Sequence, residues 1–453
     1  MIVVKFGGTS VGDSDAIRRA GDVVASRAGR SPVVVVSAAS GTTTELLALA
    51  EQAAHGHLIG ALRAVEHIRE RHVRMSEILL RDVPTGSDTT AELAAMCDEI
   101  ASLAEALATL GHITPRSQDA VACFGEQMSS LLVTEAFRAR GIPAQHIDAR
   151  EVMITSDHFN AAEPRPDAIS DRARDRIAPL VRSGIVPVLG GYIGATAAGV
   201  TTTLGRGGSD YTASLLGAAL GAEGIEIWTD VDGMLTADPR VVKNARLIPQ
   251  IRFDEASELA SFGAKVLHPN TIAPAVRRGI PVYIYNTRNP QESGTRITFD
   301  APRRAVTAIA AKGDVTVVKV SAPRMLLAQG FLRSVFEIFE RHRTSVDVVS
   351  TSEVSVSVTL DDAVRLDELL VDLRMLGDVS IERDRAIVAI VGAGIGDRGD
   401  CMGRALRALG DMHVFMVSLS ATGINLTVVV EGSAMRDAMC ALHAEFFPPD
   451  DAK

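Results

Sequence analysis

The sequence predicts an α/β protein, in which a mainly parallel sheet lies between helices and a smaller region of βαββαβ units follows. Short apolar runs at 2–6 and 33–36 each precede a small-residue loop and then a helical stretch. This order of strand, loop and helix is typical of buried parallel sheets. Beyond about residue 306 the pattern changes to strands with strict apolar–polar alternation, as at 354–360.

The bulk composition is typical of a soluble globular protein. At 453 residues the chain is too long for one ordinary core, so two or three domains are expected. A net charge of −10 without a long basic block argues against nucleic acid as a partner. Glycines and Pro187 interrupt the longest uncharged run, 183–205, so no membrane span or membrane partner is expected. Dispersed cysteines and no secretory signal predict a reduced, cytoplasmic protein.

Two strand–loop–helix units open the chain. Lys5 ends the first strand and abuts Gly7 and Gly8, and a helix is expected from about Ser14, a residue suited to capping it. This order is typical of a phosphate cradle, although no Gly-Lys-Ser/Thr closes a Walker A loop. Taken alone, Lys5 would be interpreted as a strand-end lysine that reaches solvent. In the second unit, a loop at 37–44 leads to a helix from Glu45.

The region 45–140 is expected to be mostly helical. An apolar helix starts near Cys123 and places Glu126 in its first turn. There a carboxylate interacts favourably with the helix dipole, so this electrostatic role competes with a role in ligand binding. Further strands are expected at 144–147, 186–189, 225–228 and 281–285.

The stretch 201–212 carries the strongest functional signal. Three glycines surround Arg206, and an apolar helix over 213–220 follows, which Ser209 or Asp210 would cap. Bare amides at a helix start bind anions, and an arginine fork grips a carboxylate or a phosphate. Asp210 suits the organisation of a metal ion or a lysine beside phosphate. For the Gly-Arg-Gly-Gly segment alone, a turn with an exposed arginine is an equally good interpretation.

Beyond residue 306 the sequence predicts two similar modules. The first comprises strands at 315–320, 354–360 and near Val379, with helices at 330–342 and from Asp361. The second comprises strands at 387–391, 413–419 and 425–430, with helices at 401–409 and 434–446. This order indicates an internal duplication of a βαββαβ unit. The glycines at 392–396 form a tight turn and not a dinucleotide motif, because Asp397 stands where the third glycine is needed.

The segment 5–11, Lys-Phe-Gly-Gly-Thr-Ser-Val, resembles the amino-terminal signature of aspartate kinases. The resemblance continues through Glu126, 201–212, 228–240, 262–269 and 330–358, and thus covers essentially the whole chain. It is greatest to the monofunctional, lysine-sensitive type. It implies an amino-acid-kinase catalytic domain over 1–300. A regulatory region over 301–453 would hold two ferredoxin-like ACT domains, at about 306–383 and 384–453, which are consecutive or intertwined.

The resemblance implies ATP-dependent phosphorylation of the β-carboxylate of L-aspartate, the first step toward lysine, threonine and methionine. That carboxylate is ionised at neutral pH, so no general base is needed and positioning should carry the transfer. ATP and Mg²⁺ are the implied cofactors, with the metal held mainly through the phosphates. Implied site residues are, for catalysis, Lys5 and Asp210; for aspartate, Ser37, Thr43, Glu126, Arg206 and Ser209; for nucleotide, Lys5, Gly7, Gly8, Ser10, Thr229, Asp230, Arg240 and Lys265. Leu235 departs from the aromatic residue that many relatives carry near the adenine.

Regulation by a free amino acid, with lysine as the expected effector, is a further implication. The amides of Gly330, Phe331 and Leu332 would bind its α-carboxylate, Asp347 its ammonium, and Met325 its alkyl chain. Ala328 stands where a serine is expected. The loss of this hydroxyl contact could weaken the binding of lysine or shift the effector preference toward threonine. Taken singly, Met325 and Phe331 would be core residues and Asp347 a turn residue. The remaining implied contacts are Ser345, Val346, Thr351 and Ser352.

The resemblance also implies a homodimer or tetramer, assembled through the ACT domains. Two other functions compete with an aspartate kinase. One is another acyl-phosphate-forming amino-acid kinase, such as an acetylglutamate or glutamate kinase, although Glu126 would seek a free ammonium. The other is a catalytically inactive amino-acid sensor, which the presence of Lys5, Arg206 and Asp210 disfavours.

Overall fold

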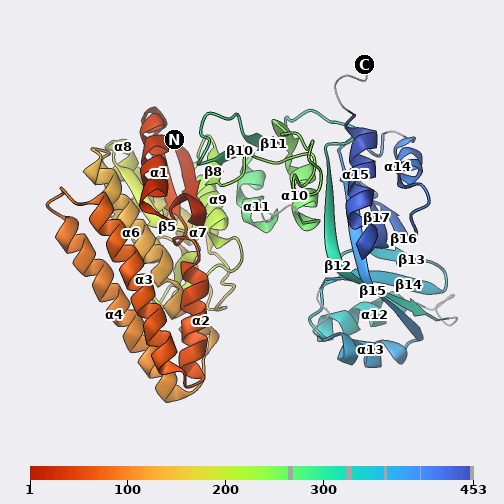
Figure 1. The fold of residues 1–453 in the computed structure, drawn as a ribbon, viewed down its shortest axis with the longest axis horizontal. Helices are drawn as coiled ribbons and strands as arrows, with labels where there is room; N and C mark the ends of the chain where they lie inside the picture. Colours follow the sequence, from red (N-terminus) through yellow and green to blue (C-terminus); the bar gives the residue numbers. More distant parts are fainter. Residues whose placement is uncertain (264–268, 323–328, 362–364, 398, 449–453) are drawn as a thin grey trace. The chain divides into compact units, whose positions relative to one another are not determined.

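The computed structural model describes residues 1–263, 269–322, 329–361, 365–397 and 399–448 (Figure 1). They form two compact units. The first comprises Met1–Met234 and Val266–Phe299, and the second comprises Leu235–Lys265 and Asp300–Lys453. None of the described helices is both long and apolar enough to cross a membrane.

The first unit is built on the predicted parallel sheet. Its strands follow the order β3 (Ala144–Ile147), β5 (Val186–Gly190), β2 (Pro32–Val36), β1 (Ile2–Phe6), β8 (Ile225–Thr229), β10 (Val282–Asn286) and β11 (Thr295–Thr298). Neighbouring strands are parallel except β10 and β11, and Lys5 lies opposite Val35 and Ile227. β1, β2 and β5 are buried along their whole length, as expected for a parallel sheet with both faces covered.

Helices cover this sheet in two groups. α6 (Phe124–Ala139) packs on β2, β3 and β5 with α1 (Ser14–Ser26) beside it, whereas α9 (Gly208–Leu220) packs on β1, β2 and β8. α7 (Pro166–Arg176) and α11 (Pro269–Arg278) pack against α9. The long helices predicted within 45–140 are α2 (Thr42–Ala54), α3 (Leu58–Leu79) and α4 (Gly86–Leu110), which pack side by side (Figure 1). Shorter elements are α5 (Pro115–Ala122), α8 (Ala178–Arg182) and a small sheet of β4 (Ile154–Thr155), β6 (Ile193–Thr196) and β7 (Thr201–Thr203).

The cap of α1 and the starts of two other helices differ from the sequence-based expectation, whereas α1 begins at Ser14 as predicted. Asp13, not Ser14, caps α1, and its carboxylate accepts a hydrogen bond from the Ala16 amide at 2.7 Å. α2 begins at Thr42 and not at Glu45, after Gly41 with φ +84°. α9 begins at Gly208 and not at Ala213. Gly207, with φ +72°, is its N-cap, so the prediction that Ser209 or Asp210 caps it is wrong.

The physical reason for the last two differences is the same. A glycine in the left-handed region turns the chain into the helix without a side-chain cap, several residues earlier than capping preferences suggest. Ser209 and Asp210 therefore lie in the first turn of α9, and their side chains are free for other contacts.

The second unit contains an antiparallel sheet. Its six strands follow the order β13 (Val349–Thr351), β14 (Ser355–Leu360), β12 (Ala308–Ser321), β15 (Asp378–Val391), β17 (Asn425–Glu431) and β16 (Val414–Leu419). β12 and β15 are each 14 residues long. The predicted separate strands near Val379 and at 387–391 are both parts of β15, so the prediction of two strands is wrong.

Two cores lie along this sheet. α12 (Phe331–Arg341) and α13 (Leu366–Arg374) form one with the carboxyl-terminal half of β12 and with β14. α14 (Cys401–Leu409) and α15 (Met435–Phe446) form the other with β17 and the second half of β15. Because Ala308 pairs with Val391 and Ser321 with Asp378, both long strands run through both modules.

The unit also includes β9 (Gln250–Arg252) and α10 (Phe253–Ser261). The fully buried Glu255 of α10 accepts hydrogen bonds from Thr307 Oγ1 and from the Ala393 amide, each at 2.7 Å. This carboxylate joins α10 to the long strands and to the glycine turn after β15.

Candidate active site

Four loops meet at one edge of the parallel sheet, because they follow the carboxyl ends of β1, β2, β5 and β8. Backbone hydrogen bonds join them. The Gly7 amide donates to the Trp228 carbonyl at 2.9 Å, the Ser37 amide to the Phe6 carbonyl at 3.0 Å, and the Gly191 amide to the Val36 carbonyl at 2.8 Å. The loop after β1 is thereby fixed between its two neighbours.

Lys5 is the cation of this edge. It is buried, and its Nζ lies 2.6 Å from Asp210 Oδ1 in the first turn of α9. The ion pair joins β1 to α9 and holds the ammonium beside the glycine loop. A Cβ added to Gly8 would lie 2.9 Å from the Ala38 carbonyl oxygen, so the loop has no space for a side chain there. A cation beside bare backbone amides is an arrangement that binds phosphate.

Glu126 is the buried acid of the same edge. Oε1 accepts a hydrogen bond from the Ala38 amide at 3.2 Å, whereas Oε2 is buried without a partner among the described residues. Burial raises the pKa of this carboxyl to about 8, although the Ala38 amide and the charge of Lys5 act in the opposite direction. A buried carboxyl with an unused oxygen can be satisfied by a cationic ligand group such as an ammonium.

Arg206 lies on the turn before α9. Gly205 and Gly207, on either side of it, have φ values of +74° and +72°. The Arg206 side chain is exposed and makes no hydrogen bond or ion pair with any residue that the structure describes. Its guanidinium is therefore available to a carboxylate or phosphate ligand.

The loop after β5 packs directly against the start of α9. A Cβ on Gly191 would lie 2.6 Å from Ser209 Cβ and 2.7 Å from its Cα. A Cβ on Gly190 would lie 2.9 Å from Glu126 Cβ. This pair of glycines therefore brings α6 and α9, with Glu126 and Ser209, close to the same loop.

The other predicted residues of the first unit lie at the same edge. Ser10 is buried, donates to the Trp228 carbonyl at 3.2 Å and lies 2.6 Å from Thr287 Oγ1. Thr229 Oγ1 donates to Asp230 Oδ1 at 3.3 Å on the loop after β8. Thr43 is in the first turn of α2, after the loop that contains Ser37.

Two predicted nucleotide contacts do not belong to the described residues of the first unit. Arg240 belongs to the second unit, is exposed, and forms an ion pair of 2.6 Å with Asp238. Lys265 lies outside the described residues. Leu235, which stands where many relatives carry an aromatic residue, is in the second unit and forms a bridge with Leu247.

The predicted effector residues lie around α12 and β13. Gly330, with φ +85°, precedes α12, and Phe331 and Leu332 form the first turn of that helix. Ser345, Val346 and Asp347 precede β13, whereas Thr351 and Ser352 are at its end. Met325 and Ala328 lie outside the described residues.

Asp347 already has a cationic partner. Lys312 Nζ on β12 lies 3.3 Å from Asp347 Oδ2 and also pairs with Asp361. Burial and the adjacent Asp361 raise the pKa of Asp347 to about 6, against the charge of Lys312. An ammonium from the chain itself thus contacts the carboxylate that was predicted to bind an effector's ammonium.

Sequence reasoning missed two buried acids of the first unit. Asp119 on α5 is 1% exposed and accepts hydrogen bonds from Thr203 and Asn160. Nothing in the sequence of the short helix at 115–122 distinguishes it from an exposed acid. Glu226, 1% exposed on β8, pairs with Arg27 and Arg30 and accepts from the Trp228 indole at 3.1 Å. Its position inside an apolar parallel strand is a signal that could have been used.

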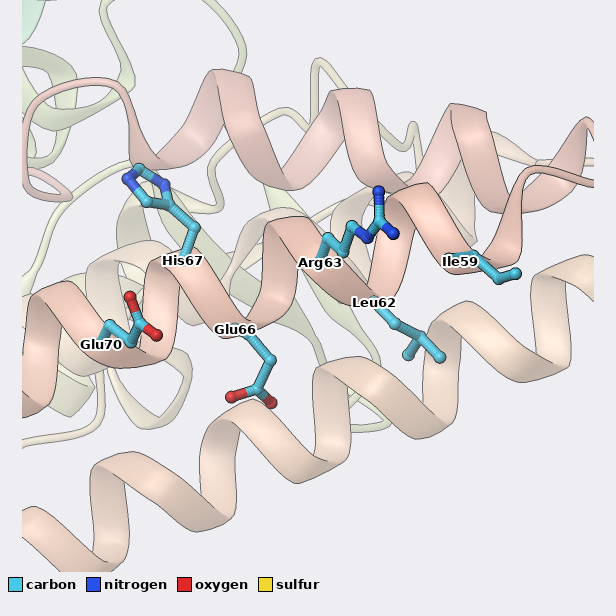
Figure 2. Close-up of a pocket in the computed structure, with 6 residues that line it drawn as sticks. All are labelled: Ile59, Leu62, Arg63, Glu66, His67 and Glu70. Carbon is cyan, nitrogen blue, oxygen red and sulfur yellow. The ribbon is translucent and has the colours of Figure 1, made fainter.

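A shallow hollow on α3 is distinct from the candidate site. It is lined only by residues of that helix, namely Ile59, Leu62, Arg63, Glu66, His67 and Glu70 (Figure 2). It carries one arginine and two glutamates, and no loop of the sheet edge contributes. It therefore gives no reason to move the site from the ends of the strands.

Comparison with known proteins identifies similar sequences and structures. An amino acid kinase family model matches residues 1–286, and an ACT domain model matches residues 388–446. Lysine-sensitive aspartokinase 3 of Escherichia coli is 38% identical over 456 residues, which cover 99% of both chains. The chloroplastic aspartokinase 1 of Arabidopsis thaliana is 35% identical over 99% of this chain and 80% of its own length.

The same similarity is seen in three dimensions. The crystal structure of E. coli aspartokinase III in complex with aspartate and ADP, in the R-state, superposes with a TM-score of 0.85 over 99% of this chain and 100% of that one. The complex of that enzyme with lysine and aspartate, in the T-state, superposes with a TM-score of 0.82 over 99% of both chains.

Proposed function

The chain belongs to the aspartokinases, and from that premise we propose that it transfers the γ-phosphoryl group of ATP to the β-carboxylate of L-aspartate. The product would be 4-phospho-L-aspartate. The observation that carries the substrate assignment is the combination of Glu126 and Arg206: among the described residues, neither the buried Oε2 of Glu126 nor the Arg206 guanidinium has a hydrogen-bond or ion-pair partner. One group seeks an ammonium and the other a carboxylate, which are the two charged groups at the α-carbon of a free amino acid.

The substrate half of the site comprises Arg206, Glu126 and three hydroxyl groups. The Arg206 fork binds the α-carboxylate with two parallel hydrogen bonds. Glu126 binds the ammonium, which supplies the partner that its buried Oε2 lacks. Ser37, Thr43 and Ser209 provide the remaining polar contacts. A substrate whose nitrogen is acetylated would leave the Glu126 carboxyl without a cation, so a free amino acid is favoured.

The phosphate half comprises Lys5, Asp210 and the glycine loop. Lys5 neutralises charge on the transferring phosphoryl group, and Gly7 and Gly8 allow the phosphates to approach the backbone. Asp210 orients Lys5 through their 2.6 Å ion pair. Because the β-carboxylate is already ionised at neutral pH, positioning and charge neutralisation are sufficient and no general base is required.

The nucleotide and its metal complete the phosphate half. Ser10, Thr229, Asp230, Arg240 and Lys265 are assigned to ATP, and the ADP in the E. coli complex supports the use of this nucleotide. Mg²⁺ prefers phosphate and carboxylate oxygens, and Asp210 supplies a carboxylate beside Lys5. The ion is therefore assigned mainly to the phosphates, where it would neutralise charge on the transferring group.

The ACT region regulates the enzyme, and lysine is the proposed effector. The name of the lysine-sensitive E. coli relative and its complex with lysine support this choice. The α-carboxylate would bind the amides that begin α12, and the ammonium would displace Lys312 from Asp347. We assign the reaction to the cytoplasm and to the first step toward lysine, threonine and methionine. We also assign the chain to a homodimer or tetramer formed through the ACT region, which sedimentation of the full chain tests.

Trapping of the acyl phosphate with hydroxylamine tests the reaction. The full chain is incubated with Mg·ATP and hydroxylamine plus L-aspartate, L-glutamate or N-acetyl-L-glutamate, and hydroxamate and ADP are both measured. Aspartate should give equal amounts of the two products, and the other acids background only. Equal hydroxamate from glutamate, or none from any acid, would contradict the proposal.

A further inference from the structure

Asp119 is a buried carboxylate that the mechanism above does not use. It lies on α5, and no ion pair to it is found among the described residues. Burial raises the pKa of this carboxyl, whereas hydrogen bonds from Thr203 and Asn160 lower it. Removing a carboxylate from water is costly unless its oxygens are satisfied. Asp119 must therefore be held by whatever donors its neighbours supply.

Its hydrogen-bond donors among the described residues belong to two segments outside α5. Thr203 donates through its amide at 3.0 Å to Oδ2 and through Oγ1 at 2.7 Å to Oδ1. The backbone N–H of Asn160 donates to Oδ1 at 3.1 Å and to Oδ2 at 3.0 Å. The carboxylate thus joins the end of β7 to the loop around Asn160. An amide side chain could not accept all of these bonds, because one of its two ends is a donor.

Both segments support the turn that carries Arg206. Only Leu204 and Gly205 separate Thr203 from Arg206. The Ala162 amide donates to the Thr203 carbonyl at 2.8 Å, and a Cβ on Gly205 would lie 3.1 Å from the Asn160 carbonyl oxygen. The turn therefore rests on the loop at 160–162, and Asp119 holds the two together.

The position of Arg206 depends on this support, because no polar contact to its side chain is found among the described residues. Its guanidinium has no hydrogen-bond or ion-pair partner in the described part of the chain. Only the backbone of the turn then determines where the fork lies. A displacement of about 1 Å at a binding group can cost around a hundredfold in rate even when the group itself is unchanged.

We propose that Asp119 is a positioning residue for substrate: it fixes the Arg206 turn through Thr203 and Asn160 and thereby sets the affinity for the amino acid's α-carboxylate. This inference rests on the proposed function, since it takes Arg206 as the carboxylate-binding group. Asp119 does not touch substrate, and it has no role in binding ATP.

The experiment measures KM for aspartate and for ATP in Asp119→Asn, Arg206→Ala and the double variant. Asp119→Asn should raise the KM for aspartate about tenfold and leave the KM for ATP within about twofold, because only the turn is displaced. In the Arg206→Ala background the same substitution should have no further effect on the KM for aspartate. Thr203→Val, which removes one donor to Asp119, should change the same parameter to a smaller extent.

One control variant separates positioning from general destabilisation. Val65→Ala in α3 removes two methyl groups from a position that is 1% exposed, and it should lower the melting temperature without changing either KM. If Asp119→Asn does not fold, the more conservative Thr203→Val and its double variant with Arg206→Ala provide the same comparison.

The outcomes distinguish this inference from the proposed function. An increase in the KM for aspartate that is equally large with and without Arg206 would overturn the positioning role, as would equal increases for aspartate and ATP. If Arg206→Ala raises the KM for aspartate but neither Asp119→Asn nor Thr203→Val does, only the inference about Asp119 fails. If Arg206→Ala itself leaves that KM unchanged, the assignment of Arg206 and the inference fail together.

Discussion

At the scale of single residues, the Lys5–Asp210 ion pair is central to the proposed chemistry. Both side chains are largely buried and lie 2.6 Å apart, so each is the main compensation for the other's charge. Removing one partner of such a pair typically costs about 3–5 kcal/mol, because a buried charge is left alone. Phosphate oxygens that enter beside Lys5 would add anionic partners without breaking this contact.

Lys5→Ala should lower kcat by about a hundredfold or more, because it removes a charge that is needed in the transition state. The comparison variant is Lys319→Ala, which changes an exposed lysine on β12 and should leave turnover unchanged. Steady-state hydroxamate formation gives kcat, and thermal unfolding shows whether the fold survives. Near-normal turnover in folded Lys5→Ala would contradict the catalytic assignment.

Glu126 should make aspartate binding depend on pH. Its pKa is raised to about 8, so the carboxyl is mostly protonated at lower pH and cannot pair with an ammonium. The ligand selects the ionised form, and binding therefore releases a proton. The KM for aspartate should fall as the pH rises toward 8, whereas the KM for ATP should not follow this trend.

The matched variant is Glu126→Gln, which keeps the shape and removes the titration. It should raise the KM for aspartate at pH 8 and flatten its pH dependence. Identical pH profiles for the wild type and this variant would show that Glu126 is not the ammonium partner.

Local pattern was sufficient to single out Lys5, Arg206 and Asp210 as candidates, because each lies within two residues of a glycine at a strand end or helix start. The unused oxygen of Glu126 could not be predicted, since it depends on Ala38 and on the loop after β5. The buried environment of Asp119 was even less predictable from the sequence. Its donors, Thr203 and Asn160, are far from it in sequence, and no local pattern marks such a contact.

At the scale of elements, the start of α9 is the feature on which both halves of the site depend. Gly207 turns the chain into the helix, and the first turn presents Ser209 and Asp210 to the loops after β5 and β1. Gly191 is the position that allows the close approach, because its missing Cβ leaves space for Ser209.

Gly191→Ala should displace the start of α9. The added Cβ would lie 2.6 Å from Ser209 Cβ, so the helix must shift and carry Ser209 and Asp210 with it. Overpacking of this kind typically costs about 1–3 kcal/mol, and kcat/KM for aspartate should fall with the melting temperature. Gly29→Ala, which has no neighbour within 4 Å of the added atom, is the control. Unchanged kinetics in Gly191→Ala would show that the packing is not required.

Strand β15 shows why an element boundary was predicted incorrectly. Glu382, Arg383, Asp384 and Arg385 form a charged run that is typical of a loop, and Asp384 has φ +55°. In the structure this run lies in the middle of β15, opposite the part of β12 where the register shifts between Lys312 and Val317. An exposed irregularity within a continuous strand is not distinguishable from a loop in a single sequence.

At the scale of the whole molecule, the question is how an effector in the ACT region changes the kinase reaction. An effector can shift an equilibrium between two states only by its difference in affinity for them. In this structure the ammonium group of Lys312 forms ion pairs with the carboxylates of both Asp347 and Asp361. A lysine effector would therefore exchange one ammonium contact for another at Asp347.

Asp347→Asn should weaken inhibition by lysine and leave uninhibited turnover unchanged, because it removes the proposed partner of the effector's ammonium. Asp361→Asn is the matched control, since it also loses a contact to Lys312 but has no assigned contact to the effector. Inhibition by lysine, threonine and methionine is titrated for all three proteins. Equal inhibition of wild type and Asp347→Asn by lysine would exclude Asp347, and no inhibition of wild type by any of them would contradict the regulatory proposal.

The order of parallel-sheet and antiparallel-sheet regions along the chain was predictable, because each region has its own periodicity of apolar residues. The placement of 235–265 was not, since it depends on contacts that are distant in sequence. Ala237 and Val242 lie in a core with β15, β17 and α15, and Glu255 bonds to Thr307 and Ala393. Nothing within that segment alone indicates these partners.

The central claim is that the site has a substrate half around Arg206 and a phosphate half around Lys5. Its most direct test is the KM of Arg206→Ala for each substrate, measured by ADP release with the other substrate saturating. Loss of a bidentate contact to a carboxylate typically costs about 1.5–3 kcal/mol, so the KM for aspartate should rise roughly tenfold to a hundredfold or more, with the KM for ATP nearly unchanged. Equal increases for both substrates, or an increase for ATP alone, would place Arg206 with the nucleotide and contradict the account.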